Sequence, residues 1–218
     1  MYNPSIFWDK LSDFYEKQNR EMTPVMKKTV ENTAKYLKNE DRVLEVGCGN
    51  ATMTCELAGK VKEIIATDIS AGMLEIAKKK KEEKNIKNIR FIQTDTFSQR
   101  FKPESFDIVI CFNVLLYITN REGFLKRIHE LLKPGGLFIS VTPCIGENKS
   151  PLKQSLRNIT LLLYLFVRLR IFASKTLSKM SSLKISDLKR EMVSSGFTLT
   201  EIENLGGWEY QYFISAGK

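Results

Sequence analysis

Histidine and paired cysteines are scarce in this chain of 218 residues. It holds one histidine, His129, and four cysteines that form no C-x-x-C pair, namely Cys48, Cys55, Cys111 and Cys144. Zinc sites use clustered Cys and His ligands, and small secreted domains use closely spaced cysteines. We therefore expect neither a metal site nor a disulfide framework, and the thiols fit a reducing compartment.

Long apolar runs are also missing. The first residues, MYNPSIFWDKLSDF, lack the basic start and continuous apolar core of a signal peptide. The uninterrupted apolar run from Leu161 to Val167 is far shorter than the roughly 20 residues that span a bilayer. These features predict a cytoplasmic protein. The length suits one α/β domain with a sizeable core and leaves little room for a second domain.

An excess of positive charge is present, but it is confined to one segment. The chain has 34 basic and 25 acidic residues, of which ten basic residues and one acid lie between Lys149 and Arg190. The other 24 basic and 24 acidic residues balance. The net charge of +9 is thus a local property, and it does not indicate a general affinity of the surface for nucleic acid.

The stretch at residues 42–54, RVLEVGCGNATMT, combines an apolar run, two glycines and a helix start. Gly47 and Gly49 let the backbone turn sharply and keep Cβ atoms away from a bound molecule, and the following helix offers unpaired N–H groups. Glu45 precedes the turn. The third glycine of the dinucleotide fingerprint G-x-G-x-x-G is absent, because Thr52 stands there. Since many α/β proteins carry such a turn, it predicts a ligand site without naming the ligand.

A second acidic position follows at the end of the apolar run KEIIATDIS. Asp68 lies roughly 20 residues beyond the glycine turn, where a carboxylate can accept hydrogen bonds from both ribose hydroxyls of an adenosine. The alternative is that Asp68 caps the helix SAGMLEIAKKKKEEK, but Ser70 is the better N-cap candidate. In that helix, residues 78–83 (KKKKEE) are expected to form a solvated face with pairing between residues four apart.

These motifs resemble those of class I S-adenosylmethionine-dependent methyltransferases. The pattern E-x-G-x-G-x-A is similar to the first motif of that family, and Asp68, Asp95 and the K-P-G-G turn at residues 133–136 are similar to later motifs in the same order. The resemblance covers roughly residues 42–218 and implies S-adenosylmethionine as cofactor and S-adenosylhomocysteine as product. It places Asp68 at the ribose, Asp95 and Thr96 at the adenine, and the backbone of residues 111–113 at the amino group. The cofactor-binding residues that it implies are Tyr15, Glu45, Gly47, Cys48, Gly49, Asp68, Ile69, Met73, Asp95, Thr96, Phe112 and Asn113.

Two helical patterns occupy residues 4–38, and the second begins at Thr23 and Pro24 as N-cap and first helical position. They resemble the helical lid that precedes the cofactor domain in many small-molecule methyltransferases. By this resemblance Tyr15 meets the methionine carboxylate of the cofactor. The alternative is that Trp8 and Tyr15 only pack the lid.

The expected fold is α/β, a doubly wound seven-stranded sheet of methyltransferase type with strand order 3-2-1-4-5-7-6 and the last strand antiparallel. The final hairpin is predicted from FTLTEIENL and WEYQYFISAGK, which flank two glycines. We expect a single domain over residues 1–218. It comprises a helical lid (1–40), a cofactor-binding core (41–145), a basic helical insertion (146–182), and the last helix with the terminal strand hairpin (183–218).

The expected acceptor is a small molecule, apolar or anionic, methylated on O, N, S or C. In-line positioning can accelerate this reaction without a catalytic side chain, and none is assigned. The His-His pair that many relatives carry after the fourth strand is replaced by Leu116-Tyr117, so a histidine base is absent there. The N/D-P-P-Y/F turn of amino-group modifiers is missing, and Pro143-Cys144 follows the fifth strand and not the fourth, so nucleic acid is not the expected partner.

Three alternatives stay open: an RNA methyltransferase, a non-catalytic cofactor-binding protein, and a membrane-surface protein on the same fold. The segment at residues 149–180 bears on them, because its pattern places Leu152, Leu156 and Leu163 on one helical face and basic residues on another. Such a helix can bind an acidic or lipophilic substrate or make peripheral membrane contact. It can also pack on the lid with its charges in water. The sequence indicates no oligomeric state.

Overall fold

Seven strands form one mixed sheet in the order β3-β2-β1-β4-β5-β7-β6. The computed structural model describes residues 4–19, 21–95, 100–144, 183–206 and 211–218. The elements are α1 (Pro4–Gln18), α2 (Pro24–Ala34), β1 (Arg42–Val46), α3 (Thr52–Leu57), η1 (Ala58–Lys60), β2 (Glu63–Asp68), α4 (Ala71–Glu83), β3 (Ile89–Gln93), β4 (Phe106–Phe112), η2 (Leu115–Tyr117), α5 (Arg121–Leu131), β5 (Leu132–Pro143), α8 (Ile185–Ser194), β6 (Thr198–Asn204) and β7 (Gln211–Gly217).

The strands follow from their composition. β1, β2 and β4 carry runs of buried apolar residues, as expected of parallel strands covered on both faces. β7 runs antiparallel to both β5 and β6, and β6 and β7 form the terminal hairpin. The predicted strand order and the predicted antiparallel last strand are therefore confirmed.

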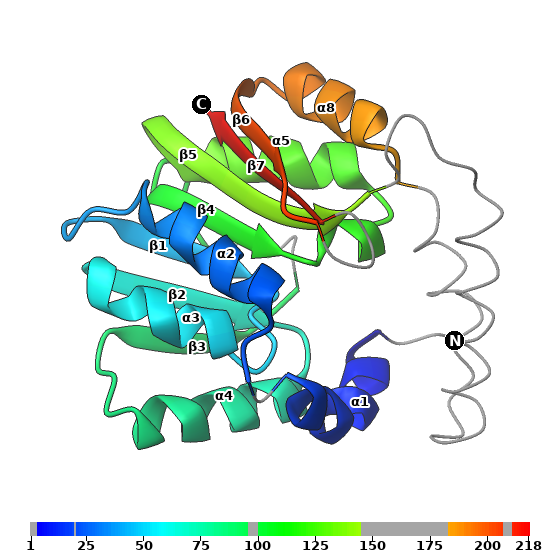
Figure 1. Cartoon of the computed structure of the whole chain (residues 1–218). Helices are drawn as coiled ribbons and strands as arrows, with labels where there is room; N and C mark the ends of the chain where they lie inside the picture. The colour runs from blue at the N-terminus through cyan, green and yellow to red at the C-terminus, as the bar shows by residue number, and fades with distance from the viewer. Residues whose placement is uncertain (1–3, 20, 96–99, 145–182, 207–210) are drawn as a thin grey trace, which may run out of the picture.

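Helices cover the two faces of the sheet. In Figure 1, α2 and α3 cross one face and α5 crosses the other. One core cluster joins α3 and α4 to the sheet, with Leu57, Ile64 and Leu74 among its buried side chains. The second cluster joins α5 and α8 to the sheet through residues such as Phe124 and Leu188. The carboxyl ends of the parallel strands are left for loops, which is where ligands bind in such sheets.

The K-P-G-G segment lies inside β5. β5 begins at Leu132, which pairs with Phe106, and the next paired residues are Leu137 and Ile108, so the four residues bulge out of the ladder. Gly135 has a φ of 75°. The expectation of a turn followed by a strand was wrong in its boundary, because the strand starts before the turn. A bulge accommodates a proline, which has no N–H to donate to a ladder.

The N-terminal helix α1 contacts the start of α4, and α2 begins at a capping threonine. Thr23 caps α2, its hydroxyl accepting from the Met26 N–H, as predicted. α1 lies beside the start of α4 (Figure 1), where the Asp9 carboxylate accepts from the Ser70 hydroxyl and the Gly72 N–H at 2.6 and 3.1 Å. A Cβ on Gly72 would lie 2.9 Å from the Ser12 hydroxyl oxygen, so the glycine permits this close approach.

The predicted insertion at residues 146–182 lies wholly outside the described residues. The four-part division of the domain therefore stays a prediction.

Candidate functional site

The glycine turn after β1 is held by the neighbouring strand. The N–H groups of Gly47 and Cys48 both donate to the Thr67 carbonyl oxygen, at 2.8 and 2.9 Å. Gly47 and Gly49 have φ values of 73° and 53°, a region that favours glycine. A Cβ on Gly47 would lie 2.3 Å from Cγ2 of Val114, so a side chain there meets the segment after β4. The turn therefore requires glycine for both its backbone angle and its packing.

Asp68, the last residue of β2, binds this turn. Its Oδ2 accepts from the Gly49 N–H at 2.8 Å and its Oδ1 from the Ser70 N–H at 2.9 Å. Ser70 caps α4, as predicted, by accepting from the Met73 N–H at 3.1 Å. Burial raises the pKa of Asp68, and the backbone N–H bonds oppose that rise. Since a carboxylate has about four acceptor sites, Asp68 retains capacity for a ligand hydroxyl.

Glu45 is a buried carboxyl group beneath the turn, with 2% of its surface exposed. Burial raises the pKa of Glu45 to about 7, and the charge of Asp68 adds to the rise. The nearby Thr54 hydroxyl lowers the pKa of Glu45, although this hydroxyl has no hydrogen-bond partner among the described residues. Oε2 of Glu45 is buried without a hydrogen-bond partner among the described residues. A buried acceptor of this kind is costly in the free protein and suits a ligand that donates to it.

Asn113 closes the site from the end of β4. Its backbone lies in the left-handed region, with a φ of 59°, and its N–H donates to the Val141 carbonyl oxygen at 2.7 Å. Within the described residues, its side-chain Oδ1 is a second buried acceptor without a partner. A strained backbone beside an unsatisfied polar atom is typical of a functional position.

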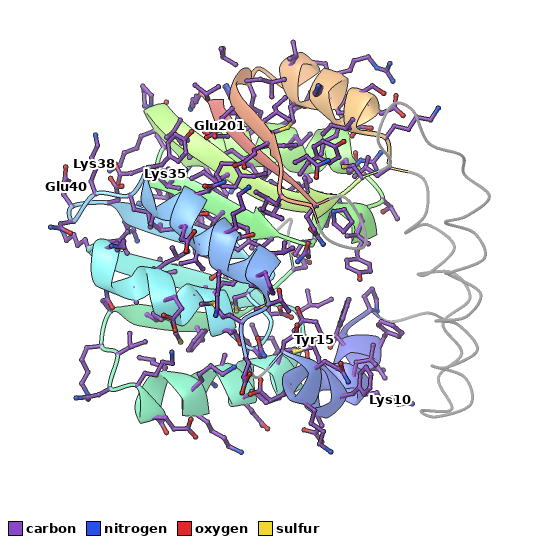
Figure 2. The ribbon with its side chains drawn as sticks, in the orientation of Figure 1. Lys10, Tyr15, Lys35, Lys38, Glu40 and Glu201 are labelled. Carbon is purple, nitrogen blue, oxygen red and sulfur yellow. The ribbon has the colours of Figure 1, made fainter. Side chains whose placement is uncertain are left out.

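Tyr15 covers the turn from the lid. Figure 2 shows Tyr15 on the side of α1 that faces the sheet, whereas Lys10 of the same helix points away from it. A Cβ on Gly49 would lie 3.8 Å from Cε1 of Tyr15. Burial raises the pKa of Tyr15, and the charge of Asp68 raises it further. The lid residue is thus close to both the turn and the carboxylate that binds it.

An aromatic cluster continues from Tyr15 toward the core. The ring of Trp8 contacts the ring of Tyr15 edge to face, with centroids 6.4 Å apart, and the ring of Tyr117 in the same way at 5.1 Å. Tyr117 belongs to η2, directly after β4. Trp8, Tyr15 and Tyr117, hereafter the aromatic cluster, therefore join the lid to the carboxyl edge of the sheet.

The other predicted site residues are placed less tightly. Ile69 links Asp68 to the cap Ser70, and Cys48 and Met73 are buried next to them. Phe112 is buried in the core cluster under α3 and α4. Asp95 is exposed one residue beyond Thr94, whose N–H donates to the Asp68 carbonyl oxygen at 2.9 Å. Thr96 lies outside the described residues, so its predicted role stays a prediction, as do the roles of the others.

A polar network between lid and turn was not predicted. The Glu16 carboxylate accepts from the Asn50 amide at 2.5 Å and pairs with the Lys80 ammonium at 3.1 Å. Lys80 also donates to the Thr52 hydroxyl at 2.7 Å. The expectation of a wholly solvated lysine run in α4 was therefore wrong for Lys80, which ties three elements together. The sequence could have pointed to Asn50 and Thr52, because they follow the glycine turn directly. It could not have pointed to Glu16 and Lys80, because these partners lie far away along the chain.

Cys144 packs in the core, and His129 packs against a core residue. Cys144, which follows Pro143, is buried, and burial raises the pKa of its thiol to about 12, which leaves little thiolate as a nucleophile. His129 packs edge to face on Phe197, with centroids 5.2 Å apart. In the described ranges no three His, Cys, Asp or Glu side chains gather in a way that could hold a metal. None of the described helices has both the length and the apolar character needed to cross a membrane.

Comparison with known proteins agrees with this geometry. Residues 37–194 match the family model described as a methyltransferase domain. Aklanonic acid methyltransferase DauC of Streptomyces sp. strain C5 is 27% identical over 147 residues, which are 66% of each chain. Demethylmenaquinone methyltransferase of Staphylococcus saprophyticus is 32% identical over 47% of this chain and 45% of its own length. The matched part thus spans less than two thirds of either relative.

The fold is shared with solved structures. A SAM-dependent methyltransferase from Aquifex aeolicus has a TM-score of 0.66 and 15% identity, with coverage of 100% of this chain and 99% of its own. At this identity the likeness shows the fold alone. The family match and the described sheet together place the chain among the class I S-adenosylmethionine-dependent methyltransferases, the family to which it belongs.

Proposed function

We propose that this protein transfers a methyl group from S-adenosylmethionine, bound at the glycine turn, to a small quinone-type or phenolic acceptor. Cofactor binding is supported by two buried acceptors near the Asp68 carboxylate, Glu45 Oε2 and Asn113 Oδ1, which have no hydrogen-bond partner among the residues that the structure describes. Three acidic or acceptor groups around one turn favour a ligand that is cationic and rich in donors. S-adenosylmethionine meets this need, since it carries an ammonium, a sulfonium and two ribose hydroxyls.

Protein residues are assigned to these groups of the cofactor as follows. Asp68 accepts from the ribose hydroxyls with the capacity left by its backbone bonds, and Glu45 and Asn113 accept from the ammonium. Tyr15 covers the methionine side from the lid. When bound, the cofactor supplies an electrophilic methyl group, and the protein's own residues orient it, shield it from water and hold its charges. The network of Glu16, Asn50, Thr52 and Lys80 supports the lid over the turn.

The acceptor half rests on the aromatic cluster. Trp8 and Tyr117 present flat apolar rings at the carboxyl edge of the sheet, next to Tyr15. Aromatic rings stack on one another edge to face or offset, and such pairs add about 0.5–1.5 kcal/mol beyond burial. The names of the relatives point the same way, since one acts on demethylmenaquinone, a quinone. A phenolic acceptor ionises more readily than an alcohol, so positioning can suffice where no histidine base follows β4.

The test is methyl transfer to a defined panel. The protein is incubated with methyl-labelled S-adenosylmethionine and, in separate reactions, hydroquinones, simple phenols, aliphatic amines and a transfer RNA mixture. Product is read by mass spectrometry as the gain of one methyl group. Labelled hydroquinone or phenol supports the proposal. Label in amines or RNA alone, or cofactor binding without any product, overturns its acceptor half and favours the RNA or the non-catalytic alternative.

Two variants of α1 sharpen this test. Trp8→Ala removes a ring of the aromatic cluster and is expected to raise the KM for the acceptor with little change in cofactor affinity. Lys10→Ala, on the exposed side of the same helix, is the matched control and is expected to leave both unchanged. The predicted membrane contact through residues 149–180 falls outside the described residues and is proposed only as a second role, to be tested by co-sedimentation with anionic vesicles.

A further inference from the structure

A cavity lies away from the glycine turn, toward the β3 edge of the sheet. It has a volume of about 650 Å³ and is lined by residues of β1, β3, β4 and the segment that precedes β4. Arg42 and Phe106 are the first residues of β1 and β4, so the cavity reaches the amino ends of these strands. Gly47, Asp68 and Asn113 stand at the opposite, carboxyl ends. The lining also reaches Gln93, the last residue of β3, which pairs with Asp68, but it contains none of the residues predicted to bind the cofactor.

The cavity exists because side chains, and no described helix, cover this part of the sheet. In the described residues between β3 and β4, the ring of Phe101 packs edge to face on Phe106, with centroids 5.5 Å apart. Both rings belong to the core cluster on this face, which includes Leu44, Ile65 and Ile92. Two aromatic rings cover less surface than a helix would. They leave a hollow beside β3, the edge strand of the sheet (Figure 1).

Four cationic side chains converge on this hollow: Arg42, Arg90, Arg100 and Lys102. Among the described residues that line it, none is acidic. Arg42 pairs with Glu63 beneath it, at 2.5 Å. Arg90, Arg100 and Lys102 are exposed, so water screens their mutual repulsion, but the potential at the hollow stays positive and attracts an anion. The lining therefore favours an anionic ligand.

Arg42 is held in a fixed orientation. Its Nη1 donates to the Ser105 carbonyl oxygen at 3.3 Å, and its guanidinium lies 5.1 Å from the centroid of the Phe106 ring. Together with the Glu63 pair, these contacts fix the side chain from three directions. An arginine fixed in this way loses little entropy when it binds an anion. In the described part of the chain, by contrast, the side chains of Arg90 and Lys102 have no ion-pair partner.

The open edge of β3 adds backbone donors. In the parallel ladder with β2, the Ile64 N–H donates to the Asn88 carbonyl and the Thr94 N–H to the Asp68 carbonyl. Because alternate residues of a parallel strand face its partner, the single peptide N–H of Phe91 points toward the open edge. Phe91 lines the cavity. A bound anion thus has both side-chain and main-chain donors within the same hollow.

We propose that this cavity binds a phosphorylated small molecule: a phosphate or diphosphate group attached to an apolar or aromatic body. The guanidinium and ammonium groups of Arg42, Arg90 and Lys102 bind the phosphate, and the ring of Phe101 lies against the body. The Phe91 ring packs in the core cluster on the other face of the sheet, so Phe91 contributes only its backbone to the cavity. Guanidinium groups match phosphate oxygens in geometry as well as in charge. The volume falls within the range of small-molecule pockets, about 300–1,000 Å³. The basic residues converge on one hollow and do not form a stripe, which favours a small ligand over a nucleic acid.

The test is calorimetric titration in low-salt buffer free of phosphate. The protein is first saturated with S-adenosylhomocysteine, and the probes are inorganic phosphate, pyrophosphate and phenyl phosphate. We expect phenyl phosphate to bind more tightly than inorganic phosphate, because its ring contacts the ring of Phe101. Arg90→Ala is expected to weaken phenyl phosphate binding about tenfold, the effect of losing one charge-assisted hydrogen bond. Arg90→Lys is expected to recover part of the loss.

The matched control is Arg190→Ala, which removes the same charge from an exposed position on α8. It is expected to change phenyl phosphate affinity less than twofold. The proposal is wrong if none of the probes binds at millimolar concentration, if Arg90→Ala has no effect, or if Arg190→Ala weakens binding as much. It is also wrong if a short RNA binds through Arg90 while phenyl phosphate does not. None of these outcomes depends on methyl transfer, so the proposed function is tested separately.

Discussion

Replacing Glu45 by glutamine is expected to stabilise the free protein and to weaken cofactor binding. Burial raises the pKa of Glu45 to about 7, against 4.5 for an exposed glutamate. Between these pH values the folded protein keeps a proton that the unfolded chain releases. Below pH 4.5 the Glu45 carboxyl is protonated in both the folded and the unfolded state, so it does not lower the free energy of unfolding relative to an uncharged side chain. As the pH rises from 4.5 to about 7, the free energy of unfolding falls. The full loss is about 3 kcal/mol.

Urea denaturation of the ligand-free protein at pH 5 and pH 8 measures this effect. At pH 5, Glu45→Gln is expected to unfold at a urea concentration close to that of wild type. At pH 8 it is expected to unfold at a clearly higher concentration, which corresponds to a gain of up to about 3 kcal/mol in the free energy of unfolding. Glu75→Gln, which removes an exposed carboxyl on α4, is the control and should follow wild type at both pH values. Equal stability of Glu45→Gln and wild type at pH 8 would refute the reasoning.

The same residue predicts how ligand binding depends on pH. An ammonium group prefers the ionised carboxyl, and at pH 6 only about a tenth of a carboxyl with a pKa near 7 is ionised. The affinity of wild type for S-adenosylhomocysteine should therefore increase about tenfold between pH 6 and the plateau above pH 7. Glu45→Gln should bind more weakly and show a flat profile over that range. An unchanged slope in the variant would mean that another group titrates.

Three further variants test the packing around the site. Gly47→Ala should lower the free energy of unfolding by about 1–3 kcal/mol and reduce cofactor affinity, because its Cβ meets Val114 and its φ is positive. Adding Val114→Ala to this variant should restore the space but not remove the backbone strain. Urea denaturation of the double variant is therefore expected to show partial rescue. Ser70→Ala should cost about 1 kcal/mol by removing the N-cap of α4, whereas no change in the unfolding midpoint would dismiss that role. A double-mutant cycle on the bidentate pair of Arg121 and Glu191 should give a coupling energy of about 1 kcal/mol, and a value near zero would show that it adds nothing to the α5–α8 contact.

Local rules and family motifs together predicted most of the fold. The caps at Thr23 and Ser70 follow from residue preferences that act over three residues, and the structure has both. The strand order required the resemblance to a known family, because hydrophobic pattern alone does not order parallel strands. The start of β5 was misplaced because Pro134 and the glycines after it indicate a turn, and a bulge inside a strand has the same local signature.

The parts of the site that were not predicted depend on contacts between distant residues. Asp9 contacts the start of α4 and Glu16 contacts Asn50, and no local pattern in α1 predicts these contacts because they form only when α1 docks. Lys80 lies in a run of four lysines, and the local sequence does not show that this one contacts Glu16 and Thr52. The basic cavity joins Arg42 to Arg90 across three strands, and no short motif contains both.

Calorimetric titration of S-adenosylhomocysteine into wild type and Asp68→Asn tests whether the glycine turn and Asp68 bind the cofactor. We expect one binding site in wild type at submillimolar ligand or below. Asp68→Asn should weaken binding by about 1–3 kcal/mol, because a charge-assisted bond to the ribose is lost while one acceptor for the backbone amides remains. A thermal unfolding curve of each protein shows whether the turn is intact. Absence of binding to folded wild type, or equal affinity of the folded variant, would contradict the account.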